Sequence, residues 1–333
     1  MDKKYVKIDL KDRRILNELD MDARMPINKL ANLVGLSRQV VKYRIERMKK
    51  DGIIIDSVAV FDSAVAGYGW YRLVLRLGPM DTPNRKEEII HFLSNHSNSL
   101  WVGIVGGNWD IVVNFIARDN YAFNALLENF LGKYGAFVKA YESLVYVKVR
   151  DQKRSHVLEN QQSVKGFNHK MKFDPLVILD NLDWKIISVL SKDCSHSNFQ
   201  IGQICGVSDK TIKSRVKFME DKKLLLGYRL LIHPSAIGYE PYMVFLGIHN
   251  LQADREDSLL KFLSASSGVT YVVKHIGRWR IGLEIEAKNR MEFQDFLVNL
   301  REKFGDIIND FEIFPIFRDY KINYFPAGDI KKS

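Results

Sequence analysis

The amino-acid sequence predicts an α+β protein in which a winged helix-turn-helix followed by a ferredoxin-like βαββαβ domain occurs twice. Asp12–Ile53 aligns without a gap to Asp183–Leu224, and in each copy the apolar spacing changes from a helical period to strand-like alternation. Nine aligned positions are identical: Asp12/Asp183, Ile15/Ile186, Leu19/Leu190, Asp22/Asp193, Gly35/Gly206, Ser37/Ser208, Lys42/Lys213, Arg44/Arg215 and Met48/Met219. The chain is therefore a tandem duplication of one long unit and not an array of short repeats.

The composition is that of a globular protein with at least two domains. The chain has 333 residues, of which 46% are apolar, and its formal net charge is +10. Its charged beginning differs from a signal peptide, and no apolar run is long enough to span a membrane, so we expect a cytoplasmic protein that is not bound to a membrane. Two cysteines, Cys194 and Cys205, are too few for a disulfide framework or a structural zinc site. Neither a metal nor a cofactor is expected.

The expected domain boundaries follow from the internal repeat and from the points where the spacing of apolar residues changes. The polar segment between the copies contains Gln161-Gln162-Ser163 and Gly166, which indicates a linker. The expected order is a helix-turn-helix domain at 1–60, a ferredoxin-like domain at 68–150, the linker at 151–174, a second helix-turn-helix domain at 175–231 and a second ferredoxin-like domain at 239–325.

Three helices are predicted at the start of each unit. Asp12 is a good N-cap for a first helix that carries Ile15, Leu16 and Leu19 at helical spacing. A short second helix follows, from Ile27 to Val34. Gly35 supplies the positive φ of a tight turn, and Ser37 caps a third helix that runs to about Lys50.

The turn itself favours a helix-turn-helix. The position where two helices must cross closely is small in both copies, Ala31 and Gly202, and the turn glycine and capping serine are identical. The alternative is an arbitrary three-helix cluster. Retention of the same three positions in two copies favours DNA binding over that alternative.

The outward face of each third helix is rich in hydrogen-bond donors. A helical wheel places Val41, Ile45 and Met48 inward, as it does Ile212, Val216 and Met219 in the second copy. Lysine and arginine on the other face neutralise phosphates, and Gln39 matches adenine in the major groove, although a solvated helix face would look similar. The predicted DNA-binding residues are Ser37, Arg38, Gln39, Lys42, Tyr43, Arg47, Ser208, Lys210, Lys213, Ser214 and Lys217.

Arg44 and Arg215 fall between the inward and outward faces. Because Asp12 and Asp183 are retained with them, each pair could tie the first helix to the third. Both aspartates could instead serve only as N-caps, which is the simpler interpretation.

Strands and helices alternate in the rest of each unit. After a strand-like connection at Ile53–Val60, the apolar pattern predicts the order strand, helix, strand, strand, helix, strand. These elements are expected at Tyr71–Leu77, Lys86–Leu93, Trp101–Val105, Asp110–Ala117, Tyr121–Lys133 and Val138–Val149, and in the second unit at Tyr242–Ile248, Asp257–Leu263, Thr270–Lys274, Arg280–Ala287, Glu292–Lys303 and Ile308–Phe317.

This arrangement resembles the Lrp/AsnC family of transcriptional regulators, twice in one chain. The residues that carry the resemblance are Asp12-Arg13-Arg14-Ile15-Leu16, Ala23-Arg24, Leu30-Ala31, Gly35-Leu36-Ser37, Arg44-Ile45 and Gly52-Ile53-Ile54. The second copy departs from the pattern at Cys194-Ser195 and at Lys223, and these departures bear on its DNA affinity more than on its fold. The resemblance implies a sequence-specific regulator whose partner is double-stranded DNA.

The resemblance also implies an amino-acid effector near the turn between the second and third strands of the ferredoxin-like domain. The effector-binding residues expected there are Gly106, Gly107, Asn108 and Asp110. Glycine amides in a turn bind carboxylates, and Asp110 would hold an ammonium group. A plain hairpin explains the same residues equally well. In the second copy Arg280 replaces Asp110, so an identical site is not expected there.

The competing function is enzymatic. Sirohaem decarboxylases are similar to Lrp/AsnC proteins in architecture and occur as paired or fused units. A His-rich strand and a Tyr-Asn step would be expected near Trp109-Asp110, whereas this chain has only His275 near its second turn. We therefore predict a regulator and no enzyme.

Duplication also predicts the assembly. A chain that holds two sheets can pair them internally as a pseudo-dimer, because the tethered partner is present at about millimolar effective concentration. A linker of this length permits internal or swapped pairing, and a higher homo-oligomer is not excluded. The expected state is a monomer with two unlike DNA-reading heads.

Overall fold

The computed structural model describes residues 5–158, 166–173, 176–250 and 252–325. In the first unit, helices α1, α2 and α3 are followed by strands, helices and short 3-10 turns in the predicted order. Their bounds are α1 Leu10–Leu19, α2 Ile27–Val34, α3 Arg38–Lys50, β1 Ile54–Phe61, η1 Ser63–Ala66, β2 Gly69–Leu77, α4 Arg85–Asn95, β3 Ser99–Val105, β4 Ile111–Ala117, α5 Asn120–Tyr134, η2 Gly135–Phe137 and β5 Val138–Gln152.

The second unit repeats this order after η3 (Ser155–Leu158) and β6 (Gly166–Lys170). Its elements are α6 Asn181–Lys192, α7 Asn198–Cys205, α8 Asp209–Asp221, β7 Leu225–Ile232, η4 Pro234–Ile237, β8 Glu240–Ile248, α9 Ala253–Ala265, β9 Val269–Ile276, β10 Ile281–Ala287, α10 Arg290–Phe304 and β11 Ile308–Ile322. The predicted α+β fold class, with two helix-turn-helix and ferredoxin-like repeats, is confirmed. No helix of the described residues has the length and apolar content needed to cross a membrane.

Eight strands form a closed ring. Within each unit the strand order is that of a ferredoxin-like sheet, β5-β2-β4-β3 and β9-β10-β8-β11, and all pairings are antiparallel. Strand β5 pairs with β2 through Val145 and then with β9, while β11 pairs with β8 through Pro315 and then with β3. The two units are therefore joined by main-chain hydrogen bonds at both edges, which leaves no free edge in the ring.

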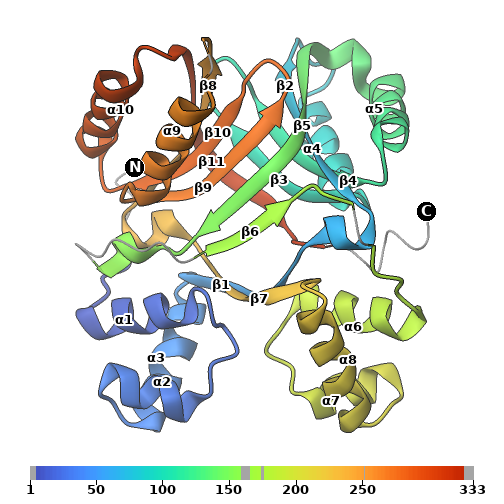
Figure 1. Ribbon diagram of the computed structural model, residues 1–333, viewed down its shortest axis with the longest axis vertical. Helices are drawn as coiled ribbons and strands as arrows, with labels where there is room; N and C mark the ends of the chain where they lie inside the picture. The colour runs from blue at the N-terminus through green and yellow to red at the C-terminus, as the bar shows by residue number, and fades with distance from the viewer. Residues whose placement is uncertain (1–4, 159–165, 174–175, 251, 326–333) are drawn as a thin grey trace.

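Helices cover the outside of this ring, and apolar side chains fill the space between its two sheets. Helices α4 and α5 lie on one side and α9 and α10 on the other (Figure 1). Between the sheets Trp109 meets Trp279 edge to face, with ring centroids 5.9 Å apart, and Phe245 and Phe314 pack beside them. The two units thus share a buried aromatic core between their sheets.

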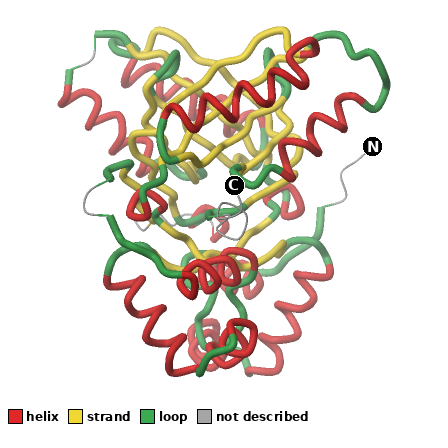
Figure 2. The backbone as a smooth tube through the Cα atoms, turned by 90° about the vertical axis from the view of Figure 1, so that its right-hand side faces the viewer, coloured by secondary structure: helices red, strands yellow, loops and turns green. Residues whose placement is uncertain are grey.

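Both helix-turn-helix heads lie below the ring, under a two-stranded ribbon formed by β1 and β7 (Figure 1). Figure 2 shows the same two tiers from the side. Each head packs against residues of the other unit. The core of α1–α3 includes Leu230, Ile232 and Tyr239 of the second unit, whereas the core of α6–α8 includes Phe61 and Trp70 of the first. Neither head therefore has a complete core without the other unit.

The predicted linker at 151–174 differs from a plain tether. Strand β5 runs on to Gln152, and β6 pairs with it from Lys148 to Gln152. His169 of β6 lies against Trp70, 5.0 Å between ring centroids. Residues 159–165 and 174–175 of this segment lie outside the described residues. Polar composition predicted a loop, but His169 and Phe167 point their rings into apolar surroundings, and such short edge strands are set by packing.

Internal pairing predicts that the chain is a monomer. Both sheet edges are already paired within one chain, so a second copy has no strand edge in the ring to join. We expect light scattering coupled to size exclusion to give the mass of one chain, 38.6 kDa, across about two orders of magnitude in concentration. A mass that is an even multiple of this value at every concentration would contradict the prediction.

The burial of His169 predicts that the folded protein loses stability in acid. Its ring is fully buried, and neither ring nitrogen finds a hydrogen-bond partner among the described residues. Burial lowers the pKa of His169 to about 4, so the unfolded chain binds the proton first as the pH falls below about 6.5. Folding stability should therefore decrease between about pH 6.5 and 4, by up to roughly 3 kcal/mol.

The measurement is urea unfolding at several pH values. The variant His169→Phe should lose part of this pH dependence, because its side chain takes up no proton. His91, an exposed histidine on α4, provides the matched control, and His91→Phe should keep the wild-type dependence. Identical pH profiles for the wild type and His169→Phe would refute the assignment.

Candidate DNA-binding surface and effector turn

The turn between α2 and α3 has the geometry that the sequence predicts. Gly35 has φ +65°, and its equivalent Gly206 has φ +76°. Ser37 accepts a hydrogen bond from the Val40 amide at 3.3 Å, and Ser208 accepts one from the Thr211 amide at 3.1 Å. Both serines are therefore engaged as helix caps at the positions where DNA contact is predicted.

The small residue in the crossing differs between copies for a steric reason. A Cβ on Gly202 would lie 2.6 Å from the Val207 carbonyl oxygen. The second turn is consequently tighter than the first, which accommodates Ala31. The recognition helix α8 is held close to α7 by this glycine.

The first helix begins one turn earlier than predicted. Asp9 is the N-cap of α1 and accepts from the Asp12 amide at 2.8 Å, while Asp12 bonds back to the Asp9 amide at 3.1 Å. Asp180 and Asp183 form the same capping box on α6. The prediction that Asp12 and Asp183 are N-caps is therefore wrong, because a better-placed aspartate precedes each of them by three residues.

The alternative role of these aspartates, a tie between helices, is confirmed. Arg44 of α3 lies 2.8 Å from both Asp9 and Asp12, and Arg215 of α8 lies 3.2 Å from Asp183. Burial opposes ionisation of Asp9, but the Asp12 amide and the Arg44 guanidinium outweigh it and lower the pKa of Asp9. Each recognition helix is thus fixed to its first helix by charge-assisted bonds.

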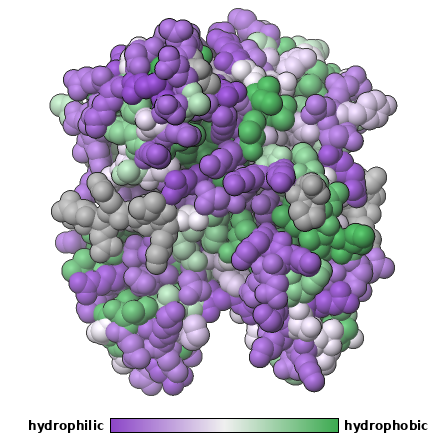
Figure 3. Space-filling view, in the orientation of Figure 1, coloured by the Kyte–Doolittle hydropathy of each residue, from purple (hydrophilic) through white to green (hydrophobic). Residues whose placement is uncertain are grey.

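Most of the predicted DNA-binding side chains lie together on exposed helix faces. The exposed set is Arg38, Gln39, Lys42 and Tyr43 on α3, and Lys210, Lys213, Ser214 and Lys217 on α8. Both heads project from the same end of the molecule, and their lower surfaces are largely hydrophilic with a notch between them (Figure 3). One duplex could therefore meet both faces.

Two of the predicted basic residues already have acidic partners. Arg47 is drawn back to the buried Asp12 and away from the outward face. Lys217 lies 3.3 Å from Asp221, an exposed pair of little energetic weight that phosphate would compete with easily. Arg47 was predicted among the DNA-binding residues, but its long side chain bends toward the nearest buried carboxylate.

The turn between β3 and β4 joins the two units. The Gly106 amide donates to the Pro315 carbonyl of β11 at 3.0 Å, and Asn108 donates to Glu312 at 3.0 Å. Asp110 accepts from the Leu77 amide at 2.8 Å. Gly107 has φ +87°, and a Cβ there would lie 3.2 Å from the Ile313 carbonyl oxygen. These contacts favour the plain hairpin, so effector binding at this turn stays a hypothesis.

Sequence reasoning did not anticipate a cavity between the ring and the ribbon. It is lined by residues of both units, none of them among the predicted sites. One signal for it is Arg72, a charged residue in a strand whose alternate positions Leu73 and Leu75 face the outer helices. No cluster of three His, Cys, Asp or Glu side chains suited to a metal ion occurs within the described part of the chain.

Comparisons with known proteins agree with this arrangement. A winged helix-turn-helix DNA-binding family model matches residues 8–55 and 179–225. The transcriptional regulator FL11 of Pyrococcus furiosus is 28% identical over 120 residues, which cover 36% of this chain and 78% of that protein. The regulatory protein AsnC of Haemophilus influenzae is 26% identical over 147 residues, 43% of this chain and 97% of AsnC.

A solved structure resembles the whole chain. The sirohaem decarboxylase NirDL superposes with a TM-score of 0.62 over 96% of each chain, at 12% sequence identity. At this identity the match concerns the fold alone. NirDL therefore shares the duplicated architecture, whereas the relatives in sequence are named as regulators.

The contacts of Asp110 lead to a prediction about the turn. Because Asp110→Ala removes a hydrogen bond to the Leu77 amide, it should lower the melting temperature and cost about 1 kcal/mol. Any rise in melting temperature produced by an amino acid should persist in this variant. A thermal-shift screen of the amino acids, repeated with Arg280→Ala as the control in the second copy, checks this. Loss of a ligand response in Asp110→Ala alone would restore the turn as the effector site.

Proposed function

We propose that this chain, a tandem duplication of the Lrp/AsnC architecture, is a sequence-specific transcriptional regulator that contacts DNA with two unlike heads. The observation that carries the proposal is the pair of exposed donor faces on α3 and α8, each placed after a glycine turn and a serine cap. Such a helix enters the major groove through its N-terminal residues. Control by a small effector is the finer part of the proposal.

The two heads would read different half-sites. Gln39 and Tyr43 of α3 are replaced at the aligned positions of α8 by Lys210 and Ser214, while Lys42 and Lys213 agree. The shared lysines suit phosphate or guanine, and the differing residues alter which bases are favoured. The preferred operator should therefore lack twofold symmetry.

The first experiment reverses charge on one recognition helix at a time. Arg38→Glu with Lys42→Glu should weaken duplex binding by at least about tenfold and reduce the dependence of affinity on salt, because fewer counterions are released. Lys210→Glu with Lys213→Glu tests the second head in the same way. Fluorescence anisotropy with a duplex enriched from a random pool, measured over a series of salt concentrations, provides the readout.

The matched control changes the charge equally but far from the heads. Lys139 and Lys261 are exposed on the ring side of the molecule, and Lys139→Glu with Lys261→Glu should leave affinity within about twofold of the wild type, since only screened long-range attraction is lost. Failure of the wild-type protein to enrich any duplex, or equal loss in the control and the head variants, would refute the proposed function.

The second candidate function is a decarboxylase acting on sirohaem, which the whole-chain likeness to NirDL brings into consideration. We expect no haem absorbance after the purified protein is mixed with an iron porphyrin, because a cavity of about 120 Å³ is near the size that admits benzene and far below that of a tetrapyrrole. A stable Soret band with one porphyrin bound per chain would favour the enzyme instead.

A further inference from the structure

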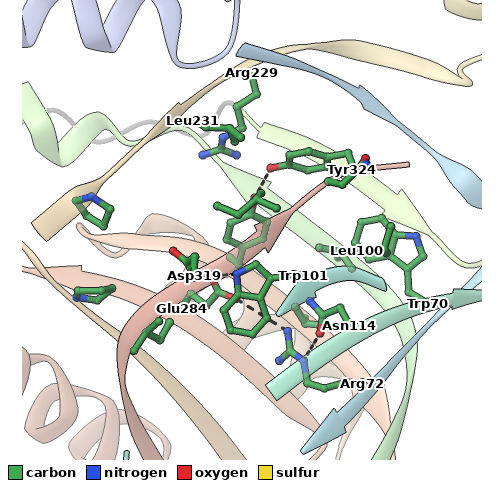
Figure 4. A pocket seen from close by; sticks show the side chains of 18 of the residues that line it. Trp70, Arg72, Leu100, Trp101, Asn114, Arg229, Leu231, Glu284, Asp319 and Tyr324 are labelled. Carbon is green, nitrogen blue, oxygen red and sulfur yellow. Dashed lines mark hydrogen bonds and ion pairs between the residues drawn. The ribbon is translucent and has the colours of Figure 1, made fainter. Parts of the chain in front are cut away.

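A cavity of about 120 Å³ lies where the strand ring meets the β1–β7 ribbon. Side chains from both units line it, and Figure 4 shows Trp101, Leu100 and Trp70 around one part of its wall, with Arg72 beside Asn114. Cavities of roughly 150 Å³ admit benzene. At about 120 Å³ this space is somewhat smaller, so it suits a small molecule whose apolar body is no larger than benzene.

Arg72 is a buried cation with no close counter-ion. Its side chain is 2% exposed and lies between the rings of Tyr146 and Phe245, 5.1 and 5.3 Å from their centroids. Its Nε donates to Asn114 at 2.9 Å, but the nearest carboxylate oxygen, on Glu284, lies 4.0 Å from Nη2. That distance is too long for a hydrogen bond. A guanidinium so far from water is costly unless an anion pairs with it.

The other arginines that line the cavity are paired. Arg154 lies 2.8 Å from Glu286, and Arg229 contacts Asp151, with Asp20 at 3.5 Å. Burial opposes ionisation of Glu286, but Arg154 and His156 lower the pKa of this carboxyl to about 2, so it is a full counter-ion. Arg72 is therefore the arginine of this cavity that lacks a close carboxylate partner.

Glu284 neutralises the charge of Arg72 only in part. Burial raises the pKa of Glu284 to about 7 even with Arg72 nearby, so this carboxyl is a weaker counter-ion than Glu286. Glu284 and Asp319 nevertheless place carboxyl groups in the same cavity. They would repel a ligand that carries a second negative charge.

We propose that this cavity is a binding site for a small monocarboxylate with an apolar body, whose carboxylate pairs with Arg72 and whose body packs against Leu100 and Trp101. Guanidinium and carboxylate form the strong, charge-assisted bonds that this buried arginine lacks. The apolar walls would gain from excluding water around the ligand.

The cavity adjoins a groove on the outside of the molecule. Leu231, Asp319 and Asn323 line both the cavity and a neighbouring groove on the outside of the molecule, next to Ile55 of β1. A ligand that entered from this groove would pass between the ribbon and β11. Leu231 belongs to the ribbon that joins the two heads, so a ligand bound in the cavity would act on the heads through this ribbon. That this would regulate DNA binding rests on the proposed function.

The test measures carboxylate binding without DNA. Calorimetry with acetate, 3-methylbutyrate and benzoate should show binding by at least one of the two apolar acids, and tighter than acetate. Benzamide has the shape of benzoate without its charge and should bind at least about tenfold more weakly than benzoate. Arg72→Met should remove the preference for benzoate, whereas Arg76→Met, on the same strand with an exposed side chain, should keep it.

A second variant covers the case in which Arg72→Met does not fold. Leu100→Phe adds volume to the cavity wall without removing charge, so it should abolish carboxylate binding while the melting temperature stays at or above that of the wild type. Absence of binding by all three acids at millimolar concentration, equal affinity for benzamide and benzoate, or equal weakening by Arg76→Met would each overturn the proposal. Carboxylate binding by a protein that binds no DNA would refute the proposed function and leave the site standing.

Discussion

The antiparallel pairing of β5 with β9 and of β11 with β3 is the constraint on which the rest of the structure depends. Each of the long strands starts in the sheet of its own unit and ends in the sheet of the other. This exchange closes the ring, brings Trp109 against Trp279 and sets the space in which the cavity lies. The hydrogen bonds of a sheet edge are thus used inside one chain, where a homodimer would use them between two.

The first helix-turn-helix head is held to the ring by buried charge that the equivalent positions of the second head lack. Arg229 of the ribbon and Asp20 at the end of α1 are fully buried, and Arg154 donates from its amide to Asp20 at 2.7 Å. At the aligned positions of the other copy stand Val58 and Ser191. Buried ion pairs contribute little net stability but are severely disrupted by the loss of one partner. The first head is therefore fixed in orientation by contacts that the second head does not make.

Local chemistry explains which parts of this molecule could be predicted from sequence. Gly35 and Ser37 favour a tight turn and a helix cap by their residue types alone, and the second copy repeats both. The helices and the fold class could therefore be predicted. The extension of β5 to Gln152, the strand β6 and the bent Arg47 depend on partners distant in sequence. The cavity depends on them most, since Arg72, Glu284 and Leu231 come from three strands in two units. No periodicity within one segment could bring them together.

Fusion of the two units in one chain allows equivalent positions of the two halves to be substituted independently. In a homodimer each change appears twice about the symmetry axis, so a charge that suits one half-site is imposed on the other. Here Asp110 is equivalent to Arg280 in the other unit, Asp20 to Ser191 and Tyr43 to Ser214, and each member of a pair has its own environment. The crossed cores keep the halves from separating while their surfaces diverge. Different residues on the exposed helix faces and different anchoring of the two heads are therefore the physical consequence of covalent duplication on a shared ring of strands.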